Sequence, residues 1–228
     1  MVLLVKTIIG ISCQLVFFAA LMFLPIGTVD WPAARFWLLI FAAAVLLSAG
    51  FLIAVRPAAL EARMRAGAKA QAPADRLAFG LMVLALLLPI ILAALDVFSW
   101  RILPAPTPAI QALGMAIFLL GFAVVFLSML ENEYAAPTVH IQDYAGHRLV
   151  DGGIYRHIRH PMYFGFLLFT VGTTLWLGST VATLFAAVVF SASAVYRIGV
   201  EEATLTKGLP GYQDYMQRVP TRFLPFIY

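Results

Sequence analysis

The sequence predicts an all-α integral membrane protein with about six transmembrane helices and a cofactor pocket at one membrane face. Hydrophobic residues make up 63% of the 228 residues and charged residues only 11%, whereas soluble globular proteins have roughly 45–50% apolar and about 25% charged residues. The apolar residues also gather in runs near the length of a membrane-crossing helix. Too few polar side chains remain to cover a surface in water, which excludes a soluble globular domain. The low charge excludes a disordered tail protein.

Charged residues or prolines bound each apolar run and set the limits of the predicted spans. The first four are residues 7–24, 36–55, 77–98 and 109–130, and Pro89 is expected to kink the third. The run 162–199 is too long for one crossing. Gly178–Ser179 near its middle is a turn signal, so we expect two further spans joined there as a tight hairpin.

The basic residues predict how the helices are oriented. The loop 56–76 carries Arg56, Arg63, Arg65, Lys69 and Arg76 against Glu61 and Asp75, and an excess of Lys and Arg marks a cytoplasmic loop. With six spans, both termini and the polar segment 131–161 fall on that same side. Of the fifteen basic residues, all but Arg35 and Arg101 are then cytoplasmic. The basic residues are thus explained by their role in orienting the helices. The net charge of +4 therefore does not indicate a nucleic-acid partner.

The chain divides into two regions by their content of chemistry-bearing residues. Residues 1–108 are a three-span membrane region, whereas residues 109–228 carry all four histidines, at positions 140, 147, 157 and 160. The histidines lack the spacing of a helical metal site, and Cys13 is the only cysteine. The sequence therefore predicts no metal site and no intramolecular disulfide.

Two polar clusters are expected to meet at the cytoplasmic face. In the segment 152–165 (GGIYRHIRHPMYFG), the glycines permit a tight backbone approach, and Arg159 and His160 are donors suited to an anion. Pro161 fits the first turn of a helix, which points Tyr163 back into the same pocket. A second cluster, Arg197, Glu201 and Glu202, lies where the last span leaves the membrane. Ionisable groups there are costly unless they are paired or functional, although snorkelling interfacial side chains are the simpler alternative.

These segments resemble the isoprenylcysteine carboxyl methyltransferase family, whose wider group includes the membrane phospholipid methyltransferases. The similarity begins with residues 149–155 and 159–165 and continues in the same order through 201–205, 211–215 and 219–225. It covers roughly residues 112–228. The departures are small: Gly152 precedes Gly153 where the family often has another residue, and Thr221 separates Pro220 from Arg222.

The resemblance implies S-adenosylmethionine (SAM) as methyl donor, S-adenosylhomocysteine as product, and a lipophilic acceptor that enters from the bilayer. The implied catalytic candidates are Glu201, Arg197 and Arg159. Each could contribute to the pocket for SAM or to the pocket for the acceptor. Which glutamate contacts SAM stays open at this point, with Glu202 expected to face SAM and Glu201 the acceptor. Carried over by position, the implied cofactor contacts are Val150, Gly153, Tyr155, His160, Pro161, Tyr163 and Glu202.

The expected reaction is methyl transfer to a prenylated cysteine carboxylate or a similar lipid-soluble molecule. A carboxylate is ionised at pH 7 and needs no general base, so the protein would supply proximity, orientation and exclusion of water. A lipid amine would need a base, for which Glu201 or Glu202 is the candidate, and a phospholipid N-methyltransferase is therefore the first alternative. A sterol-type NADPH reductase would need more spans than this chain has room for. A transporter should show repeated halves and polar helices at the midplane, and a non-catalytic scaffold is the last alternative.

Overall fold

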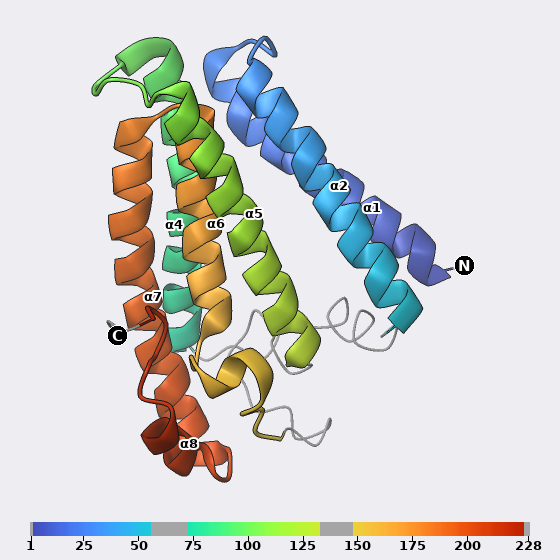
Figure 1. The fold of residues 1–228 in the computed structure, drawn as a ribbon, viewed down its shortest axis with the longest axis vertical. Helices are drawn as coiled ribbons and strands as arrows, with labels where there is room; N and C mark the ends of the chain where they lie inside the picture. The colour runs from blue at the N-terminus through green and yellow to red at the C-terminus, as the bar shows by residue number, and fades with distance from the viewer. Residues whose placement is uncertain (1, 56–72, 133–147, 226–228) are drawn as a thin grey trace.

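The computed structural model describes residues 2–55, 73–132 and 148–225, and in these ranges it contains helices and no β-strand (Figure 1). The expectation of an all-α fold is thereby confirmed. Most of the predicted basic loop 56–76, together with His140 and His147, lies outside the described residues. The long helices are α1 (Val2–Phe23), α2 (Pro32–Val55), α4 (Pro73–Leu95), α5 (Pro108–Glu131), α6 (Pro161–Leu177) and α7 (Thr180–Gly208), followed by the short α8 (Tyr212–Arg218).

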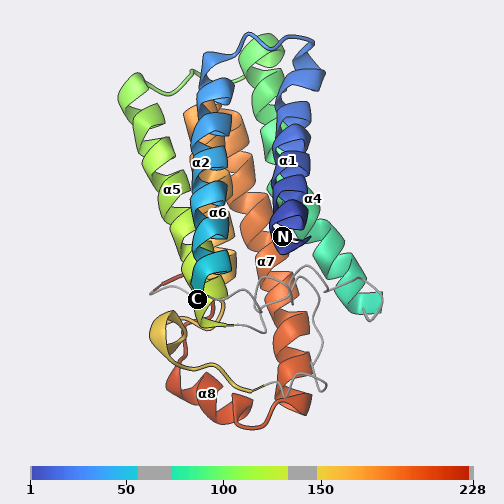
Figure 2. The ribbon, with the colours of Figure 1, turned by 90° about the vertical axis from the view of Figure 1, so that its right-hand side faces the viewer.

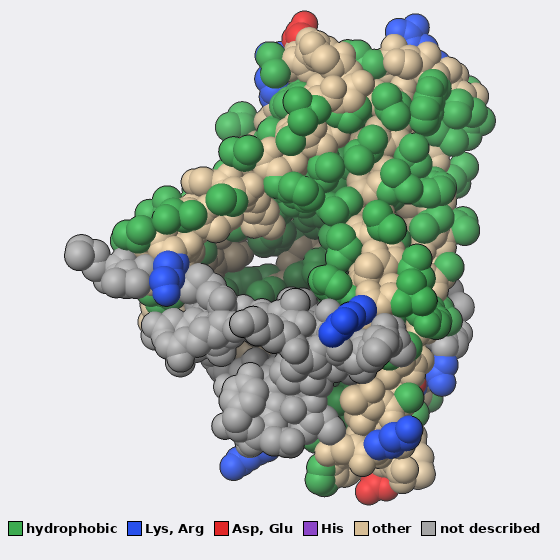
Figure 3. All heavy atoms as spheres, turned by 180° about the vertical axis from the view of Figure 1, so that it is seen from behind, with side chains coloured by type: hydrophobic (Ala, Val, Ile, Leu, Met, Phe, Trp, Pro, Cys, Tyr) green, Lys and Arg blue, Asp and Glu red, His purple; other side chains and the backbone are tan. Residues whose placement is uncertain are grey.

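Five of the described helices are long and apolar enough to cross a membrane, namely the segments Leu3–Ile26, Pro32–Val55, Asp75–Trp100, Pro108–Glu131 and Thr180–Gly208. The fifth predicted span in chain order, α6, is apolar but only 17 residues long, or about 25 Å at the usual helical rise. Seen from behind, hydrophobic side chains cover the flanks of the helices (Figure 3). The chain is an integral membrane protein, and the count of six crossings stays a prediction.

The hairpin predicted at Gly178–Ser179 is confirmed. Gly178 ends α6 in the left-handed conformation with φ +95°, where glycine is favoured. Ser179 caps α7 by accepting a hydrogen bond from the backbone of Ala182. The Ser179 hydroxyl also donates to Asp96 at 2.6 Å, which fastens this turn to the π-helical turn Asp96–Trp100 that ends the third span.

Helices α5 and α6 pack backbone against backbone through four glycines spaced seven residues apart, Gly114 and Gly121 on α5 and Gly165 and Gly172 on α6. A Cβ atom added to Gly121 would lie 2.6 Å from the carbonyl oxygen of Gly165, and one added to Gly165 would lie 2.9 Å from that of Gly121. Gly114 and Gly172 oppose each other in the same way. Small residues permit such close approach in membrane helices, and this contact fixes where α6 begins relative to the end of α5.

The first two helices form a pair that joins the other four at one end. Trp37 is fully buried, stacks on Phe41 with ring centroids 4.9 Å apart, and donates its indole N–H to Thr173 of α6. These residues lie in the first half of α2, and toward its other end the α1–α2 pair diverges from α5 (Figure 1). Helix α4, in contrast, packs along α7 and α6 (Figures 1 and 2). A residue of α4 is thus well placed to reach the site described below.

Helix α7 is longer than the predicted span. We expected its apolar crossing to finish at residue 199, but the helix continues for two more turns to Gly208. The added residues, 200–208, include Glu201 and Glu202. Both glutamates therefore project from regular helix beyond the apolar run, about 100° apart around its axis.

Candidate active site

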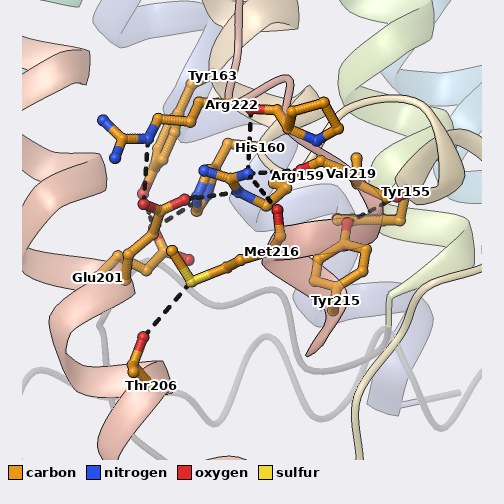
Figure 4. Close-up of polar contacts among 12 residues, drawn as sticks. Tyr155, Arg159, His160, Tyr163, Glu201, Thr206, Tyr215, Met216, Val219 and Arg222 are labelled. Carbon is orange, nitrogen blue, oxygen red and sulfur yellow. Dashed lines mark hydrogen bonds and ion pairs between the residues drawn. The ribbon is translucent and has the colours of Figure 1, made fainter. Parts of the chain in front are cut away.

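The candidate site lies where the extended end of α7 meets the start of α6 and the C-terminal segment 219–222 (Figure 4). The segment 219–222 is fastened to the loop before α6 by two backbone hydrogen bonds. The amide of Arg159 donates to the Thr221 carbonyl at 3.0 Å, and the amide of His160 donates to the Arg222 carbonyl at 2.8 Å. Pro161 then starts α6, as predicted. Residues from both polar clusters are thereby brought together.

Glu202 is the centre of a buried ionic cluster. Its Oε1 atom accepts from Arg159 Nε at 2.8 Å and lies 3.1 Å from His160 Nε2, while Oε2 lies 3.3 Å from Arg222 Nε. The side chains of Arg159, His160 and Glu202 are 4%, 5% and 7% exposed. Because both carboxylate oxygens already have cationic or polar partners, this carboxylate is fixed by the fold itself.

Arg159 also holds the C-terminal segment. Its Nη1 atom donates to the carbonyl oxygens of Val219 at 2.5 Å and Pro220 at 3.1 Å (Figure 4). The guanidinium therefore joins Glu202 of α7 to the segment that covers the site. A buried arginine without its carboxylate would be strongly destabilising, so this side chain has a structural task in addition to the catalytic one expected from the sequence.

Glu201 has a different environment from its neighbour. The Tyr163 hydroxyl donates to Glu201 Oε2 at 2.5 Å, and His160 Nδ1 lies 3.8 Å from the same oxygen. Its side chain is 25% exposed, against 7% for Glu202. Among the described residues, Glu201 is therefore the carboxylate of this cluster that is left accessible to a ligand.

Arg197 is buried on the far side of Tyr163. Its Nε atom donates to the Tyr163 hydroxyl at 3.1 Å, and its Nη1 atom donates to Asp75 Oδ1 at 2.7 Å. The sequence predicted Arg197 as a site residue but used Asp75 only as a counter-charge in the loop 56–76. The signal that could have found it is its position in the first turn of the third span, at the same predicted membrane face as Arg197.

The remaining predicted cofactor residues belong to the loop that precedes α6. Gly153 has φ +52°, and a side chain there would overlap the carboxylate of Glu131, which accepts from the Ile154 amide at 2.7 Å. The close approach expected for the glycine pair is thus confirmed for Gly153, whereas Gly152 has nothing near its Cβ position. Val150 is half-buried. Glu131, at the end of α5, is a site-shaping residue that sequence reasoning missed.

Three tyrosines stiffen the same region. Tyr155 donates to the Ser128 carbonyl at 3.4 Å, and Tyr215 donates to the Tyr155 carbonyl at 2.7 Å. Burial raises the pKa of Tyr155, Tyr212 and Tyr215 above the usual value, so their phenols stay protonated at neutral pH. Among the described residues, the Tyr212 hydroxyl is the buried side-chain polar atom without a hydrogen-bond partner. Such an orphan donor fits a site that receives a polar ligand.

Comparison with known proteins confirms the family resemblance. Residues 109–210 match the family model described as phospholipid methyltransferase. The chain is 40% identical over 76 residues to the protein-S-isoprenylcysteine O-methyltransferase of Schizosaccharomyces pombe. This alignment covers 33% of this chain and 32% of that protein. It is 39% identical over 82 residues to protein-S-isoprenylcysteine O-methyltransferase B of Arabidopsis thaliana, covering 36% and 41%. A probable protein-S-isoprenylcysteine O-methyltransferase of Oryza sativa subsp. indica is 37% identical over 90 residues, covering 39% and 46%.

These alignments span less than half the length of each relative. The matched residues 109–210 include α5, α6 and nearly all of α7, and therefore both glutamates. Asp75 and the segment 219–222 lie outside the match to the family model.

Proposed function

We propose that this protein is an integral membrane methyltransferase that transfers a methyl group from SAM to a carboxylate on a lipid-embedded acceptor, with a prenylated cysteine as the acceptor type. The site would lie at the cytoplasmic face, with both termini on that side. Helix α8 and the start of α1 lie toward the same end of the helices (Figure 2), which supports placing both chain ends on one side of the membrane. Both the names of the similar proteins and the chemistry of the site support the activity.

The observation that carries the proposal is the pair of adjacent carboxylates with unequal surroundings. Glu202 is held by Arg159, His160 and Arg222, whereas Glu201 accepts from Tyr163 and keeps a quarter of its side chain exposed. An accessible carboxylate in a largely dehydrated site is suited to a cationic ligand, because charge-assisted hydrogen bonds are strong where water is scarce. We therefore assign the contact with SAM to Glu201, the reverse of the expectation from the resemblance.

The residues present fit SAM by their chemistry. A bound SAM would supply an electrophilic methyl group on a positively charged sulfur. Glu201 offers a negative charge, and the buried hydroxyl of Tyr212 offers an unused donor and acceptor. Tyr163 and His160 lie with their rings 5.7 Å apart and nearly parallel, so they form a flat wall beside Glu201. We infer that Val150, Gly153, Tyr155 and Pro161 shape the pocket through the backbone and by packing.

The chain contributes to the reaction by positioning the two reactants and by limiting the access of water to the site. Arg159 binds the segment 219–222 across the start of α6, which shields Glu202 from water and leaves Glu201 accessible. Glu201 orients the cationic donor, and the rigid start of α6 limits the approach of the acceptor. Holding two reactants in line supplies much of the rate enhancement in such reactions. A carboxylate acceptor needs no proton removed, so no general base is required.

A phospholipid N-methyltransferase is the second candidate, because residues 109–210 match the model of that family. An amine acceptor must lose a proton, and Glu201 would be the base because Glu202 already has partners on both oxygens. The two activities therefore place different demands on Glu201. It would remove a proton from an amine, whereas a carboxylate acceptor requires no proton transfer from it.

Two measurements on the purified full chain test the proposal. Calorimetric titration should show saturable binding of SAM or S-adenosylhomocysteine and none of a nicotinamide nucleotide. Methyl transfer from labelled SAM should then be compared for a farnesylated cysteine and for phosphatidylethanolamine vesicles. Absence of SAM binding in a sample with a sharp thermal transition overturns the methyltransferase proposal, and transfer only to the amine lipid selects the second candidate.

A further inference from the structure

The N-terminal region contributes a buried carboxylate to the candidate site. Asp75 Oδ1 and Arg197 Nη1 lie 2.7 Å apart, and the exposed fractions of these side chains are 3% and 1%. Arg197 Nη1 also lies 3.4 Å from the Asp75 carbonyl oxygen. The guanidinium carbon stands 5.4 Å from the ring centroid of Phe79, one turn further along α4. The first two turns of α4 thus enclose the arginine of α7.

From Arg197 the polar contacts continue to Glu201 without a break. Arg197 Nε donates to the Tyr163 hydroxyl at 3.1 Å, and that hydroxyl donates its only hydrogen to Glu201 Oε2 at 2.5 Å. Because a tyrosine hydroxyl has one hydrogen, accepting from Arg197 leaves it free to donate to Glu201. An acceptor polarised by a cation is also a stronger donor. Hydrogen-bond donation therefore runs outward from Arg197, to Asp75 on one side and through Tyr163 to Glu201 on the other.

Glu201 is a second carboxylate near Arg197, and the two share the hydroxyl of Tyr163 as a hydrogen-bond partner. Removing the carboxylate of Asp75 takes away an ion pair from a buried guanidinium, which is strongly unfavourable. A shift of that guanidinium toward Tyr163 and Glu201 would restore an opposite charge beside it, and it would draw the Glu201 carboxylate away from a ligand.

We propose that Asp75 is a positioning residue for the active site: by holding Arg197 on the α4 side, it keeps Glu201 hydrogen-bonded to Tyr163 and open to the cationic methyl donor. The expected effect on SAM binding rests on the proposed function. The effect of Asp75 on the position of the Glu201 carboxylate does not. It gives the N-terminal region, which lies outside the matched residues 109–210, a defined task in the reaction.

The test compares SAM affinity in Asp75→Asn, Asp75→Glu and Asp96→Asn, each made in the full chain. Asp75→Asn should weaken SAM binding about tenfold, the low end expected for loss of a charged hydrogen bond, and Asp75→Glu should restore part of it. Asp96 is the matched control, because it is equally buried at the other end of the same span and bonds to Ser179. Asp96→Asn should lower thermal stability and leave SAM affinity unchanged. Wild-type affinity in Asp75→Asn, or an equal loss in Asp96→Asn, overturns the inference.

A double variant keeps the test decisive where Asp75→Asn fails to fold. Asp75→Asn with Arg197→Gln removes both charges of this buried ion pair, so it should fold and bind SAM as weakly as Arg197→Gln alone. A further loss in the double variant would show that Asp75 does not act through Arg197, and would overturn the inference.

A readout without SAM separates this inference from the proposed function. Modification of Glu201 by a water-soluble carbodiimide, followed by mass spectrometry, reports on the accessibility of that carboxylate. It should be slower in Asp75→Asn than in the wild type, and equal rates overturn the inference. Failure of the wild-type protein to bind SAM, in contrast, contradicts the proposed function alone.

Discussion

Arg159 Nε donates to Glu202 Oε1 at 2.8 Å, and neither side chain has more than 7% of its surface exposed. This contact joins the loop before α6 to α7, and through Val219 and Pro220 it also joins the C-terminal segment. The neighbouring Glu201 takes no part in it. Two adjacent acids on one helix therefore have separate tasks, one in stability and one toward the ligand, and they should respond differently to the same substitution.

Replacing each glutamate by glutamine should separate these tasks. Glu202→Gln removes the charge opposite buried Arg159 and should lower the free energy of unfolding by about 3–5 kcal/mol. Glu201→Gln should leave the melting temperature near that of the wild type and weaken SAM binding ten- to a hundred-fold, because a charged hydrogen bond is worth about 1.5–3 kcal/mol. Thermal unfolding and calorimetric titration measure the two effects. If both variants keep wild-type SAM affinity and turnover, the pair is an interfacial charge cluster and the proposed site is wrong.

Close packing of α5 on α6 should make Gly121 intolerant of a methyl group. The added Cβ would lie 2.6 Å from the Gly165 carbonyl oxygen, so the helices must move apart, at a cost of about 1–3 kcal/mol. Gly50→Ala in α2 is the matched control, since nothing lies within 4 Å of its Cβ position; this change should be neutral or stabilise by up to about 1 kcal/mol. The free energies of unfolding in detergent measure both. Equal stability of the two variants would contradict the packing described for this pair.

Orientation in the membrane can be tested by labelling single cysteines in intact cells. In a Cys13→Ser background, a membrane-impermeant thiol reagent should label Arg101→Cys from outside, because this exposed residue lies in a turn at the predicted outer face. It should not label Ala66→Cys in the predicted cytoplasmic loop until the cells are opened. The reverse pattern would invert the proposed topology and place the candidate site outside.

Alkaline pH should destabilise α8 and the loop before α6 earlier than the membrane helices. Burial raises the pKa of Tyr155, Tyr212 and Tyr215, so the folded protein keeps these protons to higher pH than the unfolded chain does. The stability they provide is complete below the usual tyrosine pKa of about 10 and is lost as the pH rises above it. Melting temperature and phenolate absorbance should change together above that pH. Tyr215→Phe should reduce the slope of melting temperature against pH in this range. An unchanged slope would mean that Tyr215 is not buried.

Much of the architecture followed from local signals in the chain. Apolar runs gave the spans, Gly178–Ser179 the hairpin, and Pro161 the start of α6, because each depends on residues within one or two turns. The apolar run ends at residue 199, whereas α7 itself ends at Gly208. Hydropathy marks where a chain leaves lipid, whereas the helix persists to Gly208 because its backbone hydrogen bonds continue regardless of the surroundings.

The sequence by itself determined that this is an all-α membrane protein, which polar residues gather at one face, and which family they resemble. Only the tertiary structure decided the pairing among those residues. Asp75 and Arg197 are 122 positions apart, and Arg159 and Glu202 are 43 apart. Which acid meets which arginine depends on how α4, α6 and α7 are rotated and shifted against each other. That register is set by packing between these three helices, where Ala85, Leu167 and Phe190 belong to one buried cluster, and no local pattern in the chain encodes it.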